Sequence, residues 1–314
     1  MIDLHLHLDG SLTPEDLVAM SRLTGEPLPT EDREELRAGM TFDGRGTLGD
    51  YLKKFDLPLS VMQTGDAVQY AVQSLGNRLA AMGYDYAEVR FAPCLHTEKG
   101  SSMDAIVQGA VKGLLSTPLP MGLILCCMRG REEKENLRTV ELAAEWRGRG
   151  VVGVDLAGAE AIYPTKGYRE VFSLAAKLGL NITIHAGEAA GEDSVRAALD
   201  FGARRIGHGV AAAKSESLLK RIKECGVAIE VCPTSNLQTG AVPSLQKHPI
   251  PIFLKKGIPI ILCSDNMTVS DTDIPREKQR LQAVFSYGEE DFSAWEAVAR
   301  THCFRGAFMR DLPE

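Results

Sequence analysis

Short apolar runs recur along the chain, separated by longer segments in which apolar residues are spaced three and four positions apart. Runs of that length predict buried strands, and the longer spacing predicts helices that cover them. The runs lie at residues 2–7, 86–91, 122–127, 151–156, 181–185, 205–207, 227–231 and 258–263, and the clearest helical stretches at 76–82, 171–178 and 216–225. Strands that alternate with helices imply parallel crossovers, and eight such repeats close a sheet into a ring. The pattern therefore predicts an α/β protein with a (β/α)8 TIM barrel.

The connection from residue 8 to residue 85 is too long to be a single helix. It begins with Thr13 and Pro14, a helix cap followed by a proline that fits the first helical turn. Because the insertion follows the first strand, at the end of the barrel where such folds place their chemistry, we expect a helical lid. Three apolar side chains of this lid either cover a ligand or pack between helices: Leu52, Phe55 and Leu57.

Composition indicates a globular protein with a large core. The 314 residues are 44% hydrophobic and 25% charged, and no low-complexity tract divides them. We therefore expect a single barrel domain over residues 1–314. A net charge of -7 and a sequence pI of about 5.6 argue against a nucleic-acid partner, because such proteins usually carry clustered positive charge.

The chain shows no sign of a membrane span or a secretion signal. No apolar run approaches the ~20 residues that a membrane helix needs, and Met1 leads directly into the first predicted strand. The seven cysteines form no C-x-x-C pair, and most lie in apolar contexts that are typical of small buried side chains in a reducing compartment. We expect a cytoplasmic protein without a membrane partner.

Histidines stand at the ends of the predicted strands. His5 and His7 share one face of the first strand because side chains alternate in a strand, and two neutral imidazoles there can bind one metal ion. Taken alone, the pair is equally well explained as two ordinary core histidines. His208, followed directly by Gly209, His185, followed by Ala186 and Gly187, and Asp265 end three other strands. These nitrogen and oxygen donors suit a catalytic zinc site that keeps an open position for water.

Seven motifs, in order along nearly the whole chain, resemble the adenosine deaminase family of metal-dependent amidohydrolases. They are His5-Leu6-His7-Leu8-Asp9-Gly10, Glu88-Val89-Arg90-Phe91-Ala92-Pro93, Asp155-Leu156-Ala157-Gly158, His185-Ala186-Gly187-Glu188, Gly207-His208-Gly209, Cys232-Pro233-Thr234-Ser235-Asn236 and Ser264-Asp265-Asn266. The resemblance implies a metallo-dependent hydrolase barrel that converts adenosine and 2'-deoxyadenosine to inosine and 2'-deoxyinosine with release of ammonia. Its partner is then a small purine nucleoside.

The resemblance also implies a ligand set for one Zn²⁺ per chain, which consists of His5, His7, His185 and Asp265. Zinc lowers the pKa of a bound water to roughly 7, so hydroxide is available at neutral pH. In the family pattern, His208 lies beside that water to orient it and to take or shuttle its proton, and Asp265 shares this proton work.

Glu188 corresponds to a family glutamate that hydrogen-bonds purine N1 and protonates it as C6 is attacked. The alternative for this residue is a surface glutamate at the start of a helix. Further substrate contacts implied by the resemblance are His7, Asp9 to a ribose hydroxyl, Gly158 through its backbone N–H, and Asn266 to N7, with Phe55 of the lid above them.

Two positions depart from the family pattern. Asn266 stands where many members have a second aspartate, and an amide, unlike an acid, always carries donor hydrogens. Ala159 stands where close relatives have an acidic residue. Both leave the substrate open among adenosine, adenine, aminodeoxyfutalosine and N6-methyl-AMP.

Other barrel amidohydrolases combine an H-x-H pair with further histidines and an aspartate to hydrolyse amides, esters or phosphotriesters. Those with two metals usually bridge them with a lysine at the end of the fourth strand, and residues 154–160 contain none. A single metal is therefore favoured. A non-catalytic purine-binding barrel is a further alternative, but it would not be expected to keep Glu188 and every ligand.

Overall fold

The computed structural model describes residues 1–44 and 46–304. Its strands are β1 (Ile2–His7), β2 (Tyr86–Phe91), β3 (Met121–Met128), β4 (Val151–Ala157), β5 (Thr183–Ala186), β6 (Arg205–His208), β7 (Ala228–Val231) and β8 (Ile260–Leu262). All pair in parallel, in two sheets with the orders β1-β2-β3-β4 and β5-β6-β7-β8. Parallel bridges between Val154 and Ile182, and between Leu6 and Asp265, join the sheets edge to edge. The predicted eight-stranded barrel is confirmed.

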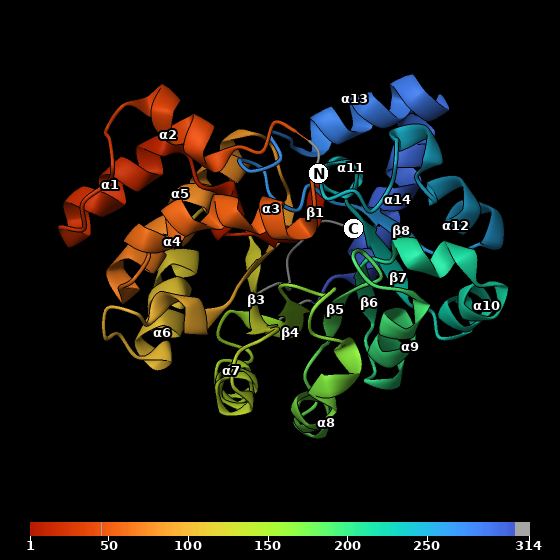
Figure 1. The fold of residues 1–314 in the computed structure, drawn as a ribbon, viewed down its shortest axis with the longest axis horizontal. Helices are drawn as coiled ribbons and strands as arrows, with labels where there is room; N and C mark the ends of the chain where they lie inside the picture. The colour runs from red at the N-terminus through yellow and green to blue at the C-terminus, as the bar shows by residue number, and fades with distance from the viewer. Residues whose placement is uncertain (45, 305–314) are drawn as a thin grey trace.

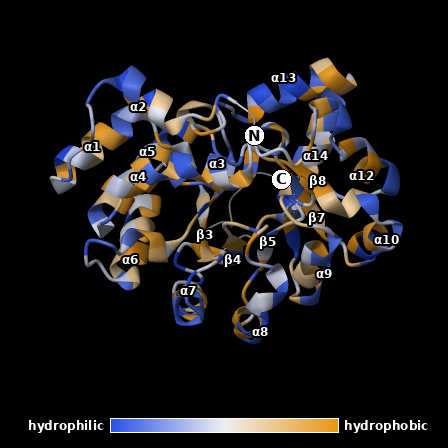
Figure 2. Ribbon diagram, viewed as in Figure 1, coloured by the Kyte–Doolittle hydropathy of each residue, from blue (hydrophilic) through white to orange (hydrophobic). Residues whose placement is uncertain are grey.

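Helices surround the strands (Figure 1). They are α1 (Pro14–Thr24), α2 (Arg33–Met40), α3 (Leu48–Leu52), α4 (Asp56–Val61), α5 (Gly65–Ala81), α6 (Met103–Leu115), α7 (Glu133–Glu145), α8 (Arg169–Lys177), α9 (Glu192–Asp200), α10 (Glu216–Glu224), α11 (Pro233–Gln238), α12 (Ile250–Lys256), α13 (Ile274–Phe285) and α14 (Glu289–His302). The strands are buried on both faces, as a parallel sheet between helices requires. Figure 2 shows the matching pattern, with hydrophobic strands in the centre and helices that carry both colours.

The insertion after β1 folds as helices α1 to α4, which lead into α5. Thr13 caps α1 as predicted: its hydroxyl accepts from the N–H of Asp16, whose carboxylate accepts in turn from the N–H of Thr13. Leu52 and Phe55 line the central cavity, which confirms a cover over the barrel mouth. For Leu57 the structure supports the other alternative, packing between helices, because it packs against the main hydrophobic core and does not line the cavity.

Strand ends differ from the predicted ones by at most two residues. The eighth strand begins at Ile260 and not at residue 258, because the chain leaves α12 through Gly257 in the left-handed conformation, with φ at +67°. Within residues 1–44 and 46–304 no helix is both long and apolar enough to cross a bilayer. The cytoplasmic location and the single domain over residues 1–314 stay predictions, and residues 305–314 lie outside the described part.

Candidate metal centre and active site

Four predicted ligands meet at the carboxyl ends of the strands. His5 and His7 come from β1, His185 from β5 and Asp265 directly after β8, and one donor atom of each lies within 4.8 Å of all the others. The Nε2 atoms of His7 and His185 are 3.1 Å apart, and Asp265 Oδ1 lies 3.3 Å from His5 Nε2 and 3.4 Å from His7 Nε2. The structure therefore brings these four side chains together at one point.

The donor set fits a divalent cation of the zinc type. Two ligands are held from behind by carboxylates: His5 Nδ1 lies 2.6 Å from Glu230 and His185 Nδ1 lies 2.9 Å from Asp155. Such carboxylates orient metal-binding imidazoles so that Nε2 faces the metal. The Nε2 atom of His5 is buried and makes no hydrogen bond among the described residues. Burial also holds the pKa of His7 well below its usual value, so its imidazole is neutral, as a ligand must be.

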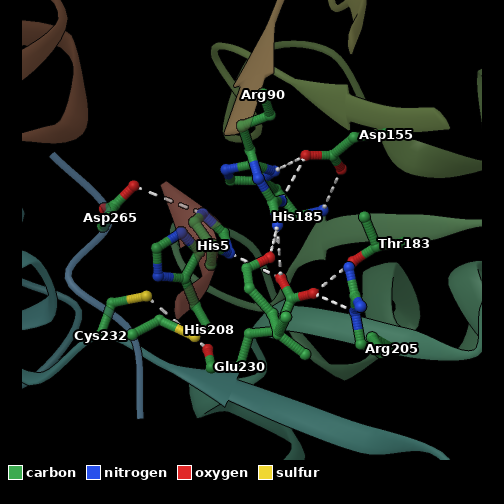
Figure 3. Close-up of polar contacts among 12 residues, drawn as sticks. His5, Arg90, Asp155, Thr183, His185, Arg205, His208, Glu230, Cys232 and Asp265 are labelled. Atoms are coloured by element: carbon green, nitrogen blue, oxygen red, sulfur yellow. Dashed lines mark hydrogen bonds and ion pairs between the residues drawn. The ribbon is translucent and has the colours of Figure 1, made fainter. Parts of the chain in front are cut away.

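A buried ionic network fixes those two carboxylates (Figure 3). Arg90 donates to Asp155 at 2.6 Å and to Glu230 at 3.1 Å, so it pairs with carboxylates inside the barrel. Arg205 donates to Glu230 at 2.6 Å and to Glu88 at 2.5 Å. All five side chains are fully buried, where a charge is tolerated only when paired. The network therefore fixes the positions of Glu230 and Asp155, and these two carboxylates orient the rings of His5 and His185.

Two site residues have strained backbones. His208 and Asp265 have φ angles of +65° and +63°, a region that non-glycine residues rarely adopt. Such strain is concentrated at functional sites, where surrounding contacts over-determine the conformation. Gly207 beside them must be glycine, since a Cβ would lie 2.9 Å from the ring of His5.

A cavity of about 190 Å³ opens over this cluster. The predicted substrate contacts that line it are His7, Asp9, Phe55, Gly158, Glu188, His208, Asp265 and Asn266. Gly158 has a φ of +103°, which explains why glycine is needed where the chain passes the cavity. The ring of Phe55 meets that of His7 edge-on, with the centroids 6.5 Å apart. Every predicted site residue except the fully buried His5 therefore faces this one cavity.

Glu188 is a buried acid and not a surface glutamate. Its carboxyl is 5% exposed, accepts from the Thr239 hydroxyl at 2.9 Å, and lies 3.6 Å from His208 Nε2. Burial, reinforced by the negative charge of Asp265, raises the pKa of Glu188 to about 8. Glu188 therefore carries a proton at neutral pH. In contrast, despite burial, the imidazoles around Asp265 hold the pKa of that carboxyl well below its usual value.

Glu160 supports the loop that carries Glu188. Its buried carboxylate accepts from four consecutive backbone N–H groups, those of residues 187–190, at 2.6 to 3.0 Å, and from the hydroxyl of Ser194. Sequence reasoning missed this residue. The signal available was an acidic residue two positions after Gly158, but nothing in the sequence indicates which backbone it binds.

Sequence reasoning also missed Glu230 as the partner of His5. A glutamate in the middle of the apolar run of β7 is a detectable signal, because an unpaired charge in a buried strand is costly. Asn236 was quoted only as part of a motif, yet its amide contacts His208 at 2.9 Å.

The remaining two predicted contacts lie at the side of the cavity. Asp9 is 5% exposed, and burial raises its pKa to about 6. Asn266 packs against Gly10 so closely that a Cβ there would lie 1.9 Å from its Oδ1 atom. Close packing on Gly10 fixes the Asn266 amide beside Asp9 at the cavity wall.

Comparison with known proteins gives a consistent result. The profile of the adenosine deaminase family matches residues 1–311. The chain is 44% identical to an adenosine deaminase of Haemophilus ducreyi over 90% of this chain and 85% of that protein, and 39% identical to one of Enterococcus faecalis over 98% and 91%. Among solved structures, it is similar to an adenine deaminase of Arthrobacter aurescens with a TM-score of 0.88 at 26% identity, covering 98% of this chain and 94% of that one. An N6-mAMP deaminase of Arabidopsis gives 0.86 at 25% identity, with 98% and 94% covered.

Proposed function

The chain belongs to the adenosine deaminase family, and from that premise we propose that its cavity hydrolyses adenosine and 2'-deoxyadenosine to inosine and 2'-deoxyinosine with release of ammonia. The protein is a hydrolase that acts on the C–N bond of a cyclic amidine. The observation that carries the proposal is the buried carboxyl of Glu188, which faces the same cavity as the four converging side chains.

His5, His7, His185 and Asp265 would hold one Zn²⁺. When bound, a zinc ion supplies Lewis acidity that brings the pKa of a water from 15.7 to roughly 7. The neutral imidazole of His7 and the carboxylates behind His5 and His185 prepare the ligands for such an ion. Zinc is proposed over other metals because three imidazoles and one carboxylate are typical of catalytic zinc sites.

Glu188 would act as the general acid. Its proton is directed into the cavity, where it bonds purine N1 and is transferred as water adds to C6. Protonation of N1 relieves the ring of the negative charge that the attack generates, so the barrier falls. His208, 3.6 Å from Glu188, would orient the attacking water, and Asp265 lies within reach of the proton that it loses.

The cavity wall favours a nucleoside over a nucleotide. None of the described residues that line the cavity is lysine or arginine, whereas Asp9 and the exposed Asp56 are both among them. A carboxylate accepts a hydrogen bond from a ribose hydroxyl but repels a phosphate. We therefore favour adenosine over AMP and N6-methyl-AMP, with Asp9 on the ribose, and Gly158 and Asn266 on the purine.

The other amidohydrolase activities have no specific support. β4 contains no lysine that could bridge a second metal ion, and Glu188 has a defined use only where a ring nitrogen must be protonated. Amide or ester hydrolysis is therefore not proposed.

The proposal is tested by loss of absorbance at the adenine band, with the zinc-loaded protein and a panel of adenosine, 2'-deoxyadenosine, adenine and AMP. We expect turnover of the two nucleosides at least about 100-fold above AMP in kcat/KM, since one repelled phosphate costs a few kcal/mol. Equal rates for AMP would overturn the charge argument. No ammonia from any member of the panel would overturn the activity.

A further inference from the structure

A chain of buried hydrogen bonds reaches His208 from behind the cavity. The backbone N–H of Ile250 donates to His248 Nδ1 at 3.3 Å, His248 Nε2 lies 3.2 Å from Asn236 Oδ1, and Asn236 Nδ2 lies 2.9 Å from His208 Nδ1. All three side chains are at most 2% exposed. Asn236 and His248 therefore cannot exchange these hydrogen-bond partners for water.

The hydrogen bond from the backbone N–H of Ile250 determines which group donates and which accepts at each of the other hydrogen bonds. A backbone N–H can only donate, so His248 Nδ1 must accept. Burial lowers the pKa of His248 to about 3, so the ring is neutral and its single proton lies on Nε2. That proton is donated to the carbonyl oxygen of Asn236. The opposite orientation of the amide would set two donors against each other, so the NH₂ group of Asn236 must face His208.

We propose that Asn236 and His248 are positioning residues that keep the imidazole proton of His208 on Nε2, so that His208 faces the substrate as a hydrogen-bond donor. An NH₂ group cannot accept, so His208 Nδ1 must keep its lone pair toward Asn236. The proton of the neutral ring then lies on Nε2, the atom 3.6 Å from Glu188.

This assignment rests on the proposed function and excludes His208 from the proton transfer that the family resemblance implies for it. With Nε2 already protonated, His208 cannot be the first acceptor of the proton that the attacking water loses. Instead, His208 Nε2–H donates a hydrogen bond to the oxygen of that water, and Asp265 accepts the proton that the water loses.

The tautomer is directly measurable. Long-range ¹H–¹⁵N spectra of histidine-labelled, zinc-loaded protein distinguish a protonated from an unprotonated ring nitrogen, and His208→Gln assigns the signal. We expect the Nε2–H form at His208. His96 provides an internal reference of the opposite kind, because its Nδ1 donates to the carbonyl of Met62 at 2.8 Å.

Variants of Asn236 and His248 then test this chain of hydrogen bonds. Asn236→Asp offers an acceptor to both rings, so the His208 proton should move to Nδ1 and kcat should fall at least about tenfold with little change in KM or zinc content. His248→Gln keeps a donor toward Asn236 and should preserve both the Nε2–H signal and most of kcat, whereas His248→Phe should lose them. His302→Gln on α14 is the matched control outside the site.

An Nδ1–H signal at His208 in the unmodified protein would overturn the proposal, as would an unchanged His208 signal in Asn236→Asp. A protein that shows the Nε2–H form but deaminates no 6-aminopurine would refute the proposed function and leave the positioning roles standing.

Discussion

Glu188 is the residue on which the chemistry depends most directly. Glu188→Gln keeps the shape and a hydrogen-bond donor but cannot transfer a proton, so we expect kcat to fall by about 10² or more. Zinc content should stay at one per chain, because Glu188 is not among the four converging ligands. Steady-state kinetics together with elemental analysis check both; a variant with nearly full activity would remove Glu188 from the mechanism.

The protonation of Glu188 also predicts a pH dependence. Because burial raises its pKa to about 8, the acid form is present below that pH and is lost as the pH rises through it. We therefore expect kcat/KM for adenosine to decline above about pH 8. A profile that stays flat well past pH 9 would contradict a single essential acid with this pKa.

Glu160 acts indirectly, because it binds the backbone of the loop that carries Glu188. Glu160→Gln is the same size, but its NH₂ group would face backbone N–H donors at one of the two oxygen positions. We expect kcat to fall about 10- to 100-fold, since misplacement of an acid by about 1 Å has that effect, and the melting temperature to fall as well. Glu170→Gln, at an exposed position on α8, is the control that should change neither.

At the scale of elements, the lid contains residues with two different roles, covering the cavity and packing in the core. The sequence did not assign these roles to individual residues. Phe55 lines the cavity, whereas Leu57, two residues on, packs into the core. Phe55→Ala should raise KM for adenosine about tenfold, because loss of an apolar contact with the ligand costs roughly 1–2 kcal/mol. Leu57→Ala should lower the melting temperature and leave KM unchanged. Reversed effects would show that the two side chains exchange roles when substrate binds.

Elements were predictable where a local rule determines them. The alternating strands and the Thr13 cap follow from periodicity and capping chemistry, and a candidate metal site follows from histidines at strand ends. The choice of His5, His7, His185 and Asp265 as its ligands came from the family resemblance. The role of Leu57 stayed open because periodicity shows that a residue is apolar but not which of two buried surfaces it meets. Glu160 and His248 were missed because their partners are backbone groups and a distant amide, contacts that only the closed fold creates.

For the whole molecule, the ligands tie together parts of the chain that are far apart in sequence. His5, His185 and Asp265 come from the start, the middle and the end of the barrel. A metal that binds only the folded state stabilises it by about 2.7 kcal/mol at 100 times its dissociation constant. Chelation should therefore lower the melting temperature by about 5–10 °C, and added Zn²⁺ should restore it together with activity. An unchanged melting temperature would show that these ligands hold no structural ion.

The contact between β1 and the segment after β8 carries a consequence for how the protein matures. The N–H of His7 donates to the carbonyl of Asp265, and the N–H of Asp265 donates to the carbonyl of His5, both at 2.8 Å. Residues that close the ring are thus among those that we propose as metal ligands. A chain whose two ends have not yet met lacks the complete set of ligands, so we expect it to bind metal more weakly than the closed barrel does.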